Sequence, residues 1–267
     1  MVLLTRTTRF ILNPPGADAR AHGGAGGFAG QPAMQGLGRY YELETVCRGE
    51  PDPVTGYLVD IKTVDSAVRG VVVPLIERAC AERPGADPAF LLQEAMDPLA
   101  RALPVELARV RWRLTPYHCV EMSADAPTIA LIRQRFEFSA SHRLHAPELS
   151  DEENRRIFGK CNNPSGHGHN YQLEPCVAVN LGADGPPFGA AQLEQIVDEV
   201  ILRRFDHKHL NLDTEEFGPG GVTPSVERIA QVCFDLLAGG LRAQYPQVEL
   251  RCVTVWETDR TSCTYPG

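Results

Sequence analysis

The sequence predicts an α+β protein of two tandem units, each an antiparallel four-stranded sheet with two helices on one face. Two observations predict this fold class. Apolar residues alternate at strand spacing and recur at helical spacing in the same order in both halves. The first half also aligns with the second at a constant offset, which indicates an internal repeat. We therefore expect a domain at 1–124 and a second at 125–267.

The first half opens with alternating residues that predict strands at 5–12 and 39–47, joined by a loop rich in glycine, alanine and proline. The turn sequence DPVTG at 52–56 then leads into a helix, and a second helix is expected at 88–102. Two strands over 106–121 close this half. The apolar stripe of the first helix is Val64, Val68, Val72, Leu75 and Ile76.

The second half has the same order of elements. Its strands are expected at 133–141, 169–181, 248–257 and 261–266. A helix at about 190–204 lies between the two strand pairs. Its inward residues are expected to be Leu193, Ile196, Val197 and Val200. A second helix is expected to begin with Thr223 as N-cap and Pro224 in the first helical position.

The internal repeat is clearest where FAGQPAMQGLGRYYELE at 28–44 lies on FGKCNNPSGHGHNYQLE at 158–174 without a gap. The identical pairs are Phe28/Phe158, Gly36/Gly166, Gly38/Gly168, Tyr41/Tyr171, Leu43/Leu173 and Glu44/Glu174. The chemistry is not repeated. The first repeat has Gln31, Leu37 and Arg39 at the positions of Cys161, His167 and His169. It cannot hold the same metal, and we expect it to be structural.

Histidines of the second half have the spacing of a metal site. His167 and His169 flank Gly168 at the start of a strand, so both imidazoles point to one face. His142 ends the preceding strand and supplies a third ligand if the two strands pair antiparallel. Three neutral imidazoles suit Zn²⁺ and leave its fourth position open, as in catalytic zinc sites.

Three interpretations of this cluster compete. The cluster is an open catalytic zinc site, a closed structural zinc site with Cys161 as fourth ligand, or a set of unrelated histidines. We favour the open site because an H-x-H pattern on a strand, shortly after a cysteine loop, is an uncommon coincidence. His145 and His209 are expected at the surface. Three cations lie close to the cluster in sequence, namely Arg143, Lys160 and Lys208. They are candidates for a patch that binds an anionic substrate.

Composition limits the class of partner and the compartment. The 26 basic and 34 acidic residues give a net charge of −8, which argues against a nucleic-acid surface. The eight cysteines have no paired spacing, and most lie in apolar runs, as buried thiols do. No segment has the apolar length of a signal peptide or membrane span. We therefore expect a reduced, cytoplasmic protein with no membrane or nucleic-acid partner.

The segments FSASHRLH, FGKCNNPSGHGHNY, FDHKHLNLD, TPSVERIA and VWETD occur in that order within residues 133–267. Together they resemble the 6-pyruvoyl tetrahydropterin synthase family. The resemblance implies the tunnelling fold (T-fold) of paired antiparallel strands with two helices on one face. The first half resembles this fold weakly, best in DPVTGYLVDIKTV at 52–64, and departs from the family at every aligned catalytic position.

The resemblance also implies roles for single residues. The zinc ligands would be His142, His167 and His169. Cys161 would be the base or proton carrier, and the carboxylate of Asp206 would orient His207 as a proton relay. Glu257 would hold the amidine edge of a pterin by a two-pronged hydrogen bond, and Glu227 would lie near the pterin pocket. From the residues alone, Asp206 and His207 have an alternative role in capping a helix end.

The activity implied by the resemblance is a zinc-dependent lyase. It would convert 7,8-dihydroneopterin triphosphate to 6-pyruvoyl-tetrahydropterin with release of triphosphate. A 6-carboxytetrahydropterin synthase of the queuosine pathway, on the same substrate, is the alternative, and a non-catalytic zinc- or pterin-binding scaffold is a more remote one. The family's rings of continued sheets imply a homo-oligomer with one working site per chain.

Overall fold

The computed structural model describes residues 1–17, 28–185 and 187–267, so the loop expected around His22 lies partly outside the described residues. The chain forms two compact units, Met1–Ile132 with Asn180–Ala183 and Arg133–Val179 with Asp184–Gly267. Each unit contains both a sheet and helices, which confirms the α+β class. The units divide at 132/133, eight residues beyond the expected boundary. The expected strand at 133–141 is divided into β5 (Ile129–Gln134) and β6 (Phe136–His142).

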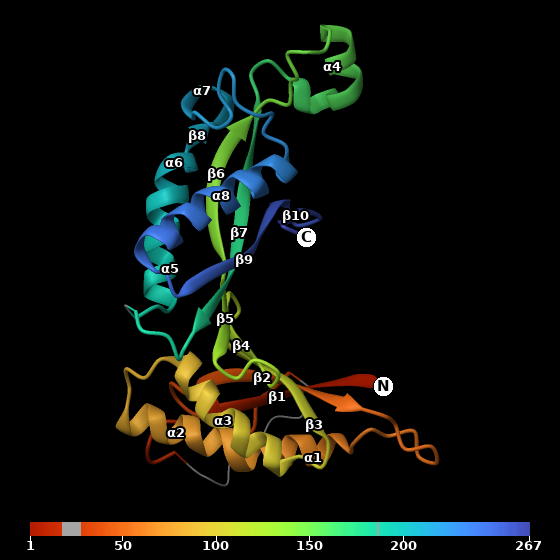
Figure 1. Cartoon of the computed structure of the whole chain (residues 1–267), viewed down its shortest axis with the longest axis vertical. Coiled ribbons are helices and arrows are strands. Elements are labelled where there is room, and N and C mark those ends of the chain that lie inside the picture. Colours follow the sequence, from red (N-terminus) through yellow and green to blue (C-terminus); the bar gives the residue numbers. More distant parts are fainter. Residues whose placement is uncertain (18–27, 186) are drawn as a thin grey trace. The chain divides into compact units, whose positions relative to one another are not determined.

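The sheet of the first unit has the order β1-β2-β3-β4-β5. The pairs from β1 to β4 are antiparallel, as expected. Its other strands are β1 (Val2–Leu12), β2 (Arg39–Gly49), β3 (Glu106–Thr115) and β4 (His118–Ser123). Its helices are α1 (Ile61–Ala67), α2 (Val73–Glu82) and α3 (Pro88–Ala102), and the π-helical segment η1 (Val68–Val72) joins α1 to α2. In Figure 1 these helices lie on one side of the strands, in the orange to yellow part of the chain.

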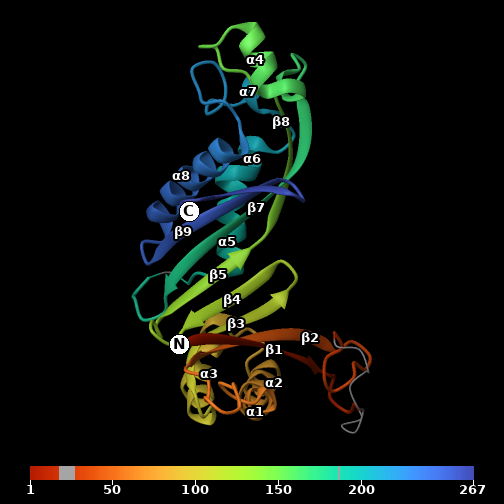
Figure 2. The ribbon, with the colours of Figure 1, turned by 90° about the vertical axis from the view of Figure 1, so that its right-hand side faces the viewer.

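The second unit has the sheet order β8-β6-β7-β9-β10. Its strands are β6, β7 (His167–Asn180), β8 (Lys208–His209), β9 (Val248–Thr258) and β10 (Thr261–Tyr265). We expected a purely antiparallel sheet, but the two-residue strand β8 pairs with β6 in parallel. The helices are α4 (Asp151–Phe158), α5 (Ala190–Val197), α6 (Arg203–Phe205), α7 (Leu210–Asp213) and α8 (Val226–Gln244), with a 3-10 segment η2 (Gly159–Asn162) and a π-helical segment η3 (Asp198–Leu202). Figures 1 and 2 both show α5 and α8 on the same face of β7 and β9.

The first long helix of each unit buries every fourth residue. In the first unit these residues are Val64, Val68, Val72 and Ile76, and in the second they are Leu193, Val197, Ile201 and Phe205. An α-helix has 3.6 residues per turn, so a stripe at a strict spacing of four drifts by about 40° per step. A π-helical turn is wider and takes up this drift. The expected inward residue Val200 is only half-buried, with its side chain against Gly240 of α8, and η3 places Ile201 in the core instead.

Each unit places a phenylalanine opposite the repeated tyrosine, which is Tyr41 in the first unit and Tyr171 in the second. Phe10 is the register partner of Tyr41 on β1 and β2, and Phe138 is the partner of Tyr171 on β6 and β7. The ring centroids lie 5.7 Å apart in the first pair and 5.1 Å apart in the second. The segments η1 and η3 begin at residues 68 and 198, which is the same offset of 130 residues as the sequence repeat.

Two smaller expectations are wrong. The N-cap of α8 is Ser225, whose Oγ accepts a hydrogen bond from the backbone N–H of Arg228, and not Thr223. Residue Pro224 lies outside the helix because its carbonyl is bound by a histidine described below. Most cysteines are also less buried than expected. Only Cys47, Cys176 and Cys233 are buried, while the other five lie on half-buried strand and helix positions.

A salt bridge on the first sheet gives a testable contribution to stability. The carboxylate of Glu121 is 7% exposed and lies 2.5 Å from Nη2 of Arg111. Arg111→Met is expected to destabilise the protein by about 3 kcal/mol, because it leaves a buried carboxylate without its main partner. Urea denaturation measures the change. The control is Arg113→Met, whose guanidinium is 42% exposed and 3.9 Å from its partner Glu42. Equal effects of both substitutions would contradict this account.

Candidate metal and catalytic site

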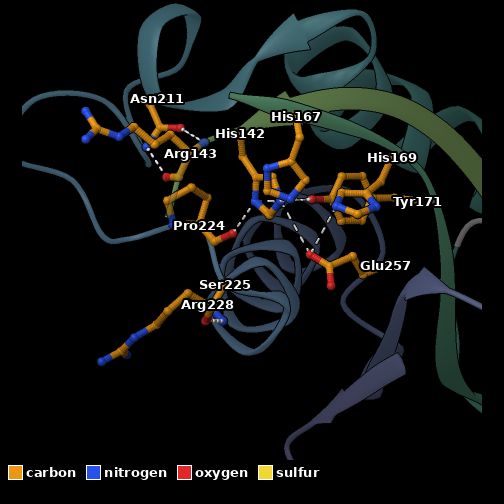
Figure 3. Close-up of polar contacts among 10 residues, drawn as sticks. All are labelled: His142, Arg143, His167, His169, Tyr171, Asn211, Pro224, Ser225, Arg228 and Glu257. Carbon is orange, nitrogen blue, oxygen red and sulfur yellow. Dashed lines mark hydrogen bonds and ion pairs between the residues drawn. The ribbon is translucent and has the colours of Figure 1, made fainter. Parts of the chain in front are cut away.

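Three imidazoles meet where β6 ends and β7 begins. The antiparallel register pairs His142 with His167 and Ala140 with His169, so all three histidines share one face of the sheet. One nitrogen of each ring lies within 4.8 Å of the others. Figure 3 shows the rings pointing toward one another. The antiparallel pairing on which the third ligand depended is therefore confirmed.

The orientation of His142 is fixed by hydrogen bonds. Its ring is fully buried, and its Nδ1–H donates to the carbonyl of Pro224 over 2.7 Å. This bond leaves the lone pair of Nε2 facing the other two histidines, as in metal sites where a backbone carbonyl sets the tautomer. The backbone after His142 is also held, because the side chain of Asn211 forms hydrogen bonds of 2.7 and 3.1 Å with the N–H and carbonyl of Arg143 (Figure 3).

The donor set fits a metal ion. Nε2 of His142 lies 3.1 Å from Nε2 of His167. Two Zn–N bonds of ordinary length at a tetrahedral angle would separate the nitrogens by about 3.3 Å. Nε2 of His169 is buried without a hydrogen-bond partner among the described residues. A bound cation would supply that missing partner, since a buried polar atom is rarely left alone.

The buried imidazole makes the metal-free protein sensitive to acid. Burial lowers the pKa of His142 from 6.5 to about 4, and the neighbouring histidines add to this effect. Between these pH values the unfolded chain binds a proton that the folded chain does not. Stability is therefore full above about pH 6.5 and falls as the pH drops toward 4, by on the order of 2–3 kcal/mol.

Urea denaturation of chelator-treated protein at several pH values measures this loss. The control is His142→Asn, which removes the titrating ring and should flatten the dependence between pH 6.5 and 4. An unchanged slope in this variant would show that another group is responsible.

Glu257 and Tyr171 complete the surroundings of the three rings. Oε1 of Glu257, near the end of β9, lies 3.4 Å from Nε2 of His142 and 3.6 Å from Nε2 of His169. The hydroxyl of Tyr171 lies 3.4 Å from the ring nitrogens of His142. Burial raises the pKa of Tyr171, and the charges of Glu257 and Cys161 add to the rise. The phenol therefore stays neutral and able to donate a hydrogen bond.

Cys161 lies in the 3-10 segment η2 and is half-buried. Its carbonyl accepts a hydrogen bond from the N–H of Leu144 over 2.9 Å, which ties η2 to the chain just after β6. The sulfur lies close enough to Tyr171, which contacts the cluster, to contribute to the raised pKa of that phenol. Among the described residues it is not a member of the metal-binding group.

Asp206 and His207 form a pair at the sheet edge. The carboxylate of Asp206 accepts a hydrogen bond from the N–H of Ser139 at 2.8 Å and lies 2.9 Å from Nδ1 of His207. These two contacts, with that of Ser139 the larger, hold the pKa of Asp206 below its usual range. The side chain of His207 is 81% exposed. In the described part of the chain, no hydrogen bond or ion pair joins this pair to Cys161.

His207 lies in an unusual backbone conformation. Its φ of 57° is in the left-handed region, and its N–H donates to the carbonyl of Ser139 over 2.6 Å. Its side chain lines an open cavity of about 510 Å³ together with Asn170, Lys208 and His169. The strained backbone turns the imidazole out of the sheet edge toward solvent, as happens at functional positions.

The remaining expected residues lie farther from the rings. Glu227 is exposed in the first turn of α8, where a hydrogen bond with Ser225 lowers its pKa. Of the three nearby cations, Lys208 lines the cavity, whereas the guanidinium of Arg143 is bound to the carbonyl of Asn162 over 3.1 Å. Lys160 is in η2. Of the three, Lys208 is therefore the one that lines the cavity beside His169 and His207.

Two histidines expected at the surface are more enclosed. Nδ1 of His145 lies 3.1 Å from the amide nitrogen of Asn162. Nδ1 of His209 is buried without a partner among the described residues, and the charge of this ring contributes to the lowered pKa of His142. His209 packs on Gly166, where a Cβ would lie 2.7 Å from Nε2 of the imidazole.

Comparison with known proteins relates the second unit to one family. A family model described as 6-pyruvoyl tetrahydropterin synthase matches residues 131–267. The 6-pyruvoyl tetrahydrobiopterin synthase of Homo sapiens is 40% identical over 139 residues, which cover 52% of this chain and 92% of that protein. The Drosophila melanogaster protein of the same name is 39% identical over 142 residues, or 52% of this chain and 80% of that protein.

A solved structure gives a similar match. The 6-pyruvoyl tetrahydropterin synthase of Caenorhabditis elegans is 34% identical, with a TM-score of 0.45, over 52% of this chain and 96% of that one. The family model contains all three clustered histidines and leaves residues 1–130 outside its range.

Proposed function

Because the chain belongs to the 6-pyruvoyl tetrahydropterin synthase family, we propose that it is a lyase that converts 7,8-dihydroneopterin triphosphate to 6-pyruvoyl-tetrahydropterin with release of triphosphate. The observation that carries the proposal is the convergence of His142, His167 and His169 within the matched region. These rings lie beside a carboxylate and a tyrosine, and a cysteine is close enough to influence that tyrosine.

The metal in this proposal is one Zn²⁺ per chain, held by His142, His167 and His169. The neutral state of the buried His142 and the orphaned nitrogen of His169 support this assignment. When bound, zinc would lower the pKa of substrate hydroxyl groups and stabilise the negative charge that develops next to them.

Cys161 is proposed to remove and return protons on the side-chain carbons of the substrate. Its half-buried position in η2, which a hydrogen bond ties to the chain just after His142, supports a sulfur near the reacting atoms. Asp206 is proposed to orient His207 as the second proton carrier, and the 2.9 Å contact between them supports this role.

Glu257 is proposed to bind the amidine edge of the pterin, with Glu227 nearby. The carboxylate of Glu257 is only 20% exposed and faces the imidazoles. An acceptor pair that matches two N–H groups orients a planar ring strongly.

The chain is further proposed to consist of two tandem T-fold units, a structural one at 1–124 and a catalytic one at 125–267. The shared register of Phe10/Tyr41 and Phe138/Tyr171 and the recurrence of the π segment support the repeat. We also propose a homo-oligomer. The exposed His207 on an edge next to β6 supports a relay that is completed by a neighbouring subunit.

Mass spectrometry of the pterin product tests the function. Zinc-loaded protein is incubated with 7,8-dihydroneopterin triphosphate without any reductase. The expected products are 6-pyruvoyl-tetrahydropterin and free triphosphate. A 6-carboxy product with acetaldehyde would assign the carboxy-forming reaction instead. Binding of zinc and pterin without turnover would indicate a scaffold.

In the part of the chain that the structure describes, no helix has the length and apolar character needed to cross a membrane.

A further inference from the structure

Two cysteines of the second unit lie opposite each other on neighbouring strands. Cys176 on β7 is the register partner of Cys252 on the antiparallel strand β9. The register shifts directly after this pair, between Cys176 and Val177, so a β-bulge adjoins it. Neither forms a disulfide in the structure. Other strand cysteines have different partners, since Cys47 faces Leu107 and Cys263 faces Val255.

The register makes a bond between the two sulfurs sterically possible. Residues directly opposite in an antiparallel ladder have Cα atoms about 4.5–5.5 Å apart, and their side chains point to the same face. Disulfides span Cα distances of about 4.4–6.8 Å. The thiol of Cys176 is already within hydrogen-bond reach of Cys252. The usual spacing of such a pair therefore falls within the range that a disulfide spans.

The surroundings divide the two thiols into an attacking and a resolving group. Cys176 is 1% exposed, whereas Cys252 is half-buried and can be reached by a small oxidant. The hydrogen bond with Cys176 and then the charge of Arg133 lower the pKa of Cys252 to about 6. A thiolate is the nucleophilic form of cysteine, so Cys252 is the one that reacts first.

We propose that Cys176 and Cys252 are a peroxide-sensitive pair that forms a reversible disulfide between β7 and β9. The Cys252 thiolate attacks one oxygen of hydrogen peroxide, which yields a sulfenic acid and, after protonation, one water. The Cys176 sulfur then displaces the hydroxyl group from that sulfenic acid, which gives the disulfide and a second water. The two thiols lose two electrons and two protons in total, and a dithiol reductant reverses the change.

The position of the pair links it to the clustered histidines. β7 carries His167 and His169 at its start, and β9 carries Glu257 near its end. A disulfide would therefore join the two strands that hold opposite sides of the site. Because the register is already formed, we expect the cross-link to stabilise this sheet rather than distort it. The loop it closes is long, which favours a large effect on the unfolded chain.

The test uses the full-length, zinc-loaded protein treated with hydrogen peroxide, alkylated and then digested for peptide mass mapping. The expected result is a cross-linked Cys176–Cys252 peptide that is lost on treatment with dithiothreitol. The melting temperature should rise by roughly 5 °C or more on oxidation and return on reduction. Cys252→Ser should abolish both changes. The matched control Cys263→Ser, a half-buried strand thiol of the same unit, should leave both unchanged.

Separate alkylation of Cys176 and Cys252 at a peroxide dose that fully oxidises Cys161 would overturn the proposal. So would a sulfinic acid at Cys252 without any cross-link, or a disulfide to another cysteine. If Cys252→Ser fails to fold, peptide mapping of the wild-type chain alone decides the outcome. The readouts are independent of turnover, so they stand whether or not the lyase activity is found.

Discussion

Replacing Cys161 with alanine is expected to lower kcat by about 10²–10⁴-fold, the usual contribution of a positioned acid or base. Zinc content should remain near one ion per chain, because the three imidazole nitrogens group without the sulfur. Steady-state assay of the lyase reaction and elemental analysis of the same preparation measure both quantities. The thiol lies in the short segment η2 on the surface side of the site, so the truncation should not unfold the protein.

Cys263→Ala is the control, since its sulfur is also half-buried in the second unit but lies on β10, away from η2. It should retain full turnover. Loss of zinc from the Cys161→Ala protein would contradict the proposal and would support the closed structural site in which sulfur is the fourth ligand.

Replacing His169 with alanine is expected to weaken zinc binding by on the order of 100-fold or more and to abolish turnover. The imidazole is one of the three proposed ligands, and its Nε2 has no hydrogen-bond partner among the described residues. Its side chain is 18% exposed, so truncation should leave a smaller cavity than loss of the fully buried His142. Competition with a coloured zinc chelator measures the affinity.

His145→Ala is the matched control, because it removes a half-buried imidazole of the same unit that contacts Asn162 rather than the cluster. It should bind zinc normally. Equal loss of zinc in both variants would contradict the three-histidine site.

Wild-type zinc content near two per chain would contradict the structural role of the first unit.

The metal-binding geometry could be predicted because it depends on one strand pair. The alternation around His167 and His169 sets their common face, and antiparallel pairing of β6 with β7 then brings in His142. The alternation of side chains along a strand and the pairing of two strands close in the chain are local properties, so a sequence pattern can indicate both. The same reasoning identified the buried stripe from Val64 to Ile76 in the first unit.

Other features depend on contacts that no local pattern contains. Pro224 was expected to begin α8, but its carbonyl binds His142, and the helix starts after Ser225 instead. The strand β8 is two residues long and gave too short a signal, so the enclosure of His209 could not be foreseen. No local pattern indicated how Cys161 in η2 lies relative to His207 beside β8.

The π-helical segments separate the packing of the fold from its chemistry. Wide turns of this kind are often found at functional sites. Here, however, the first unit contains η1 although Leu37 and Arg39 stand at the positions that align with His167 and His169. In this unit the wide turn is explained by packing, since the spacing of four between Val64, Val68 and Val72 needs it. A π-helical turn in this protein therefore does not mark the half of the chain that holds the clustered histidines.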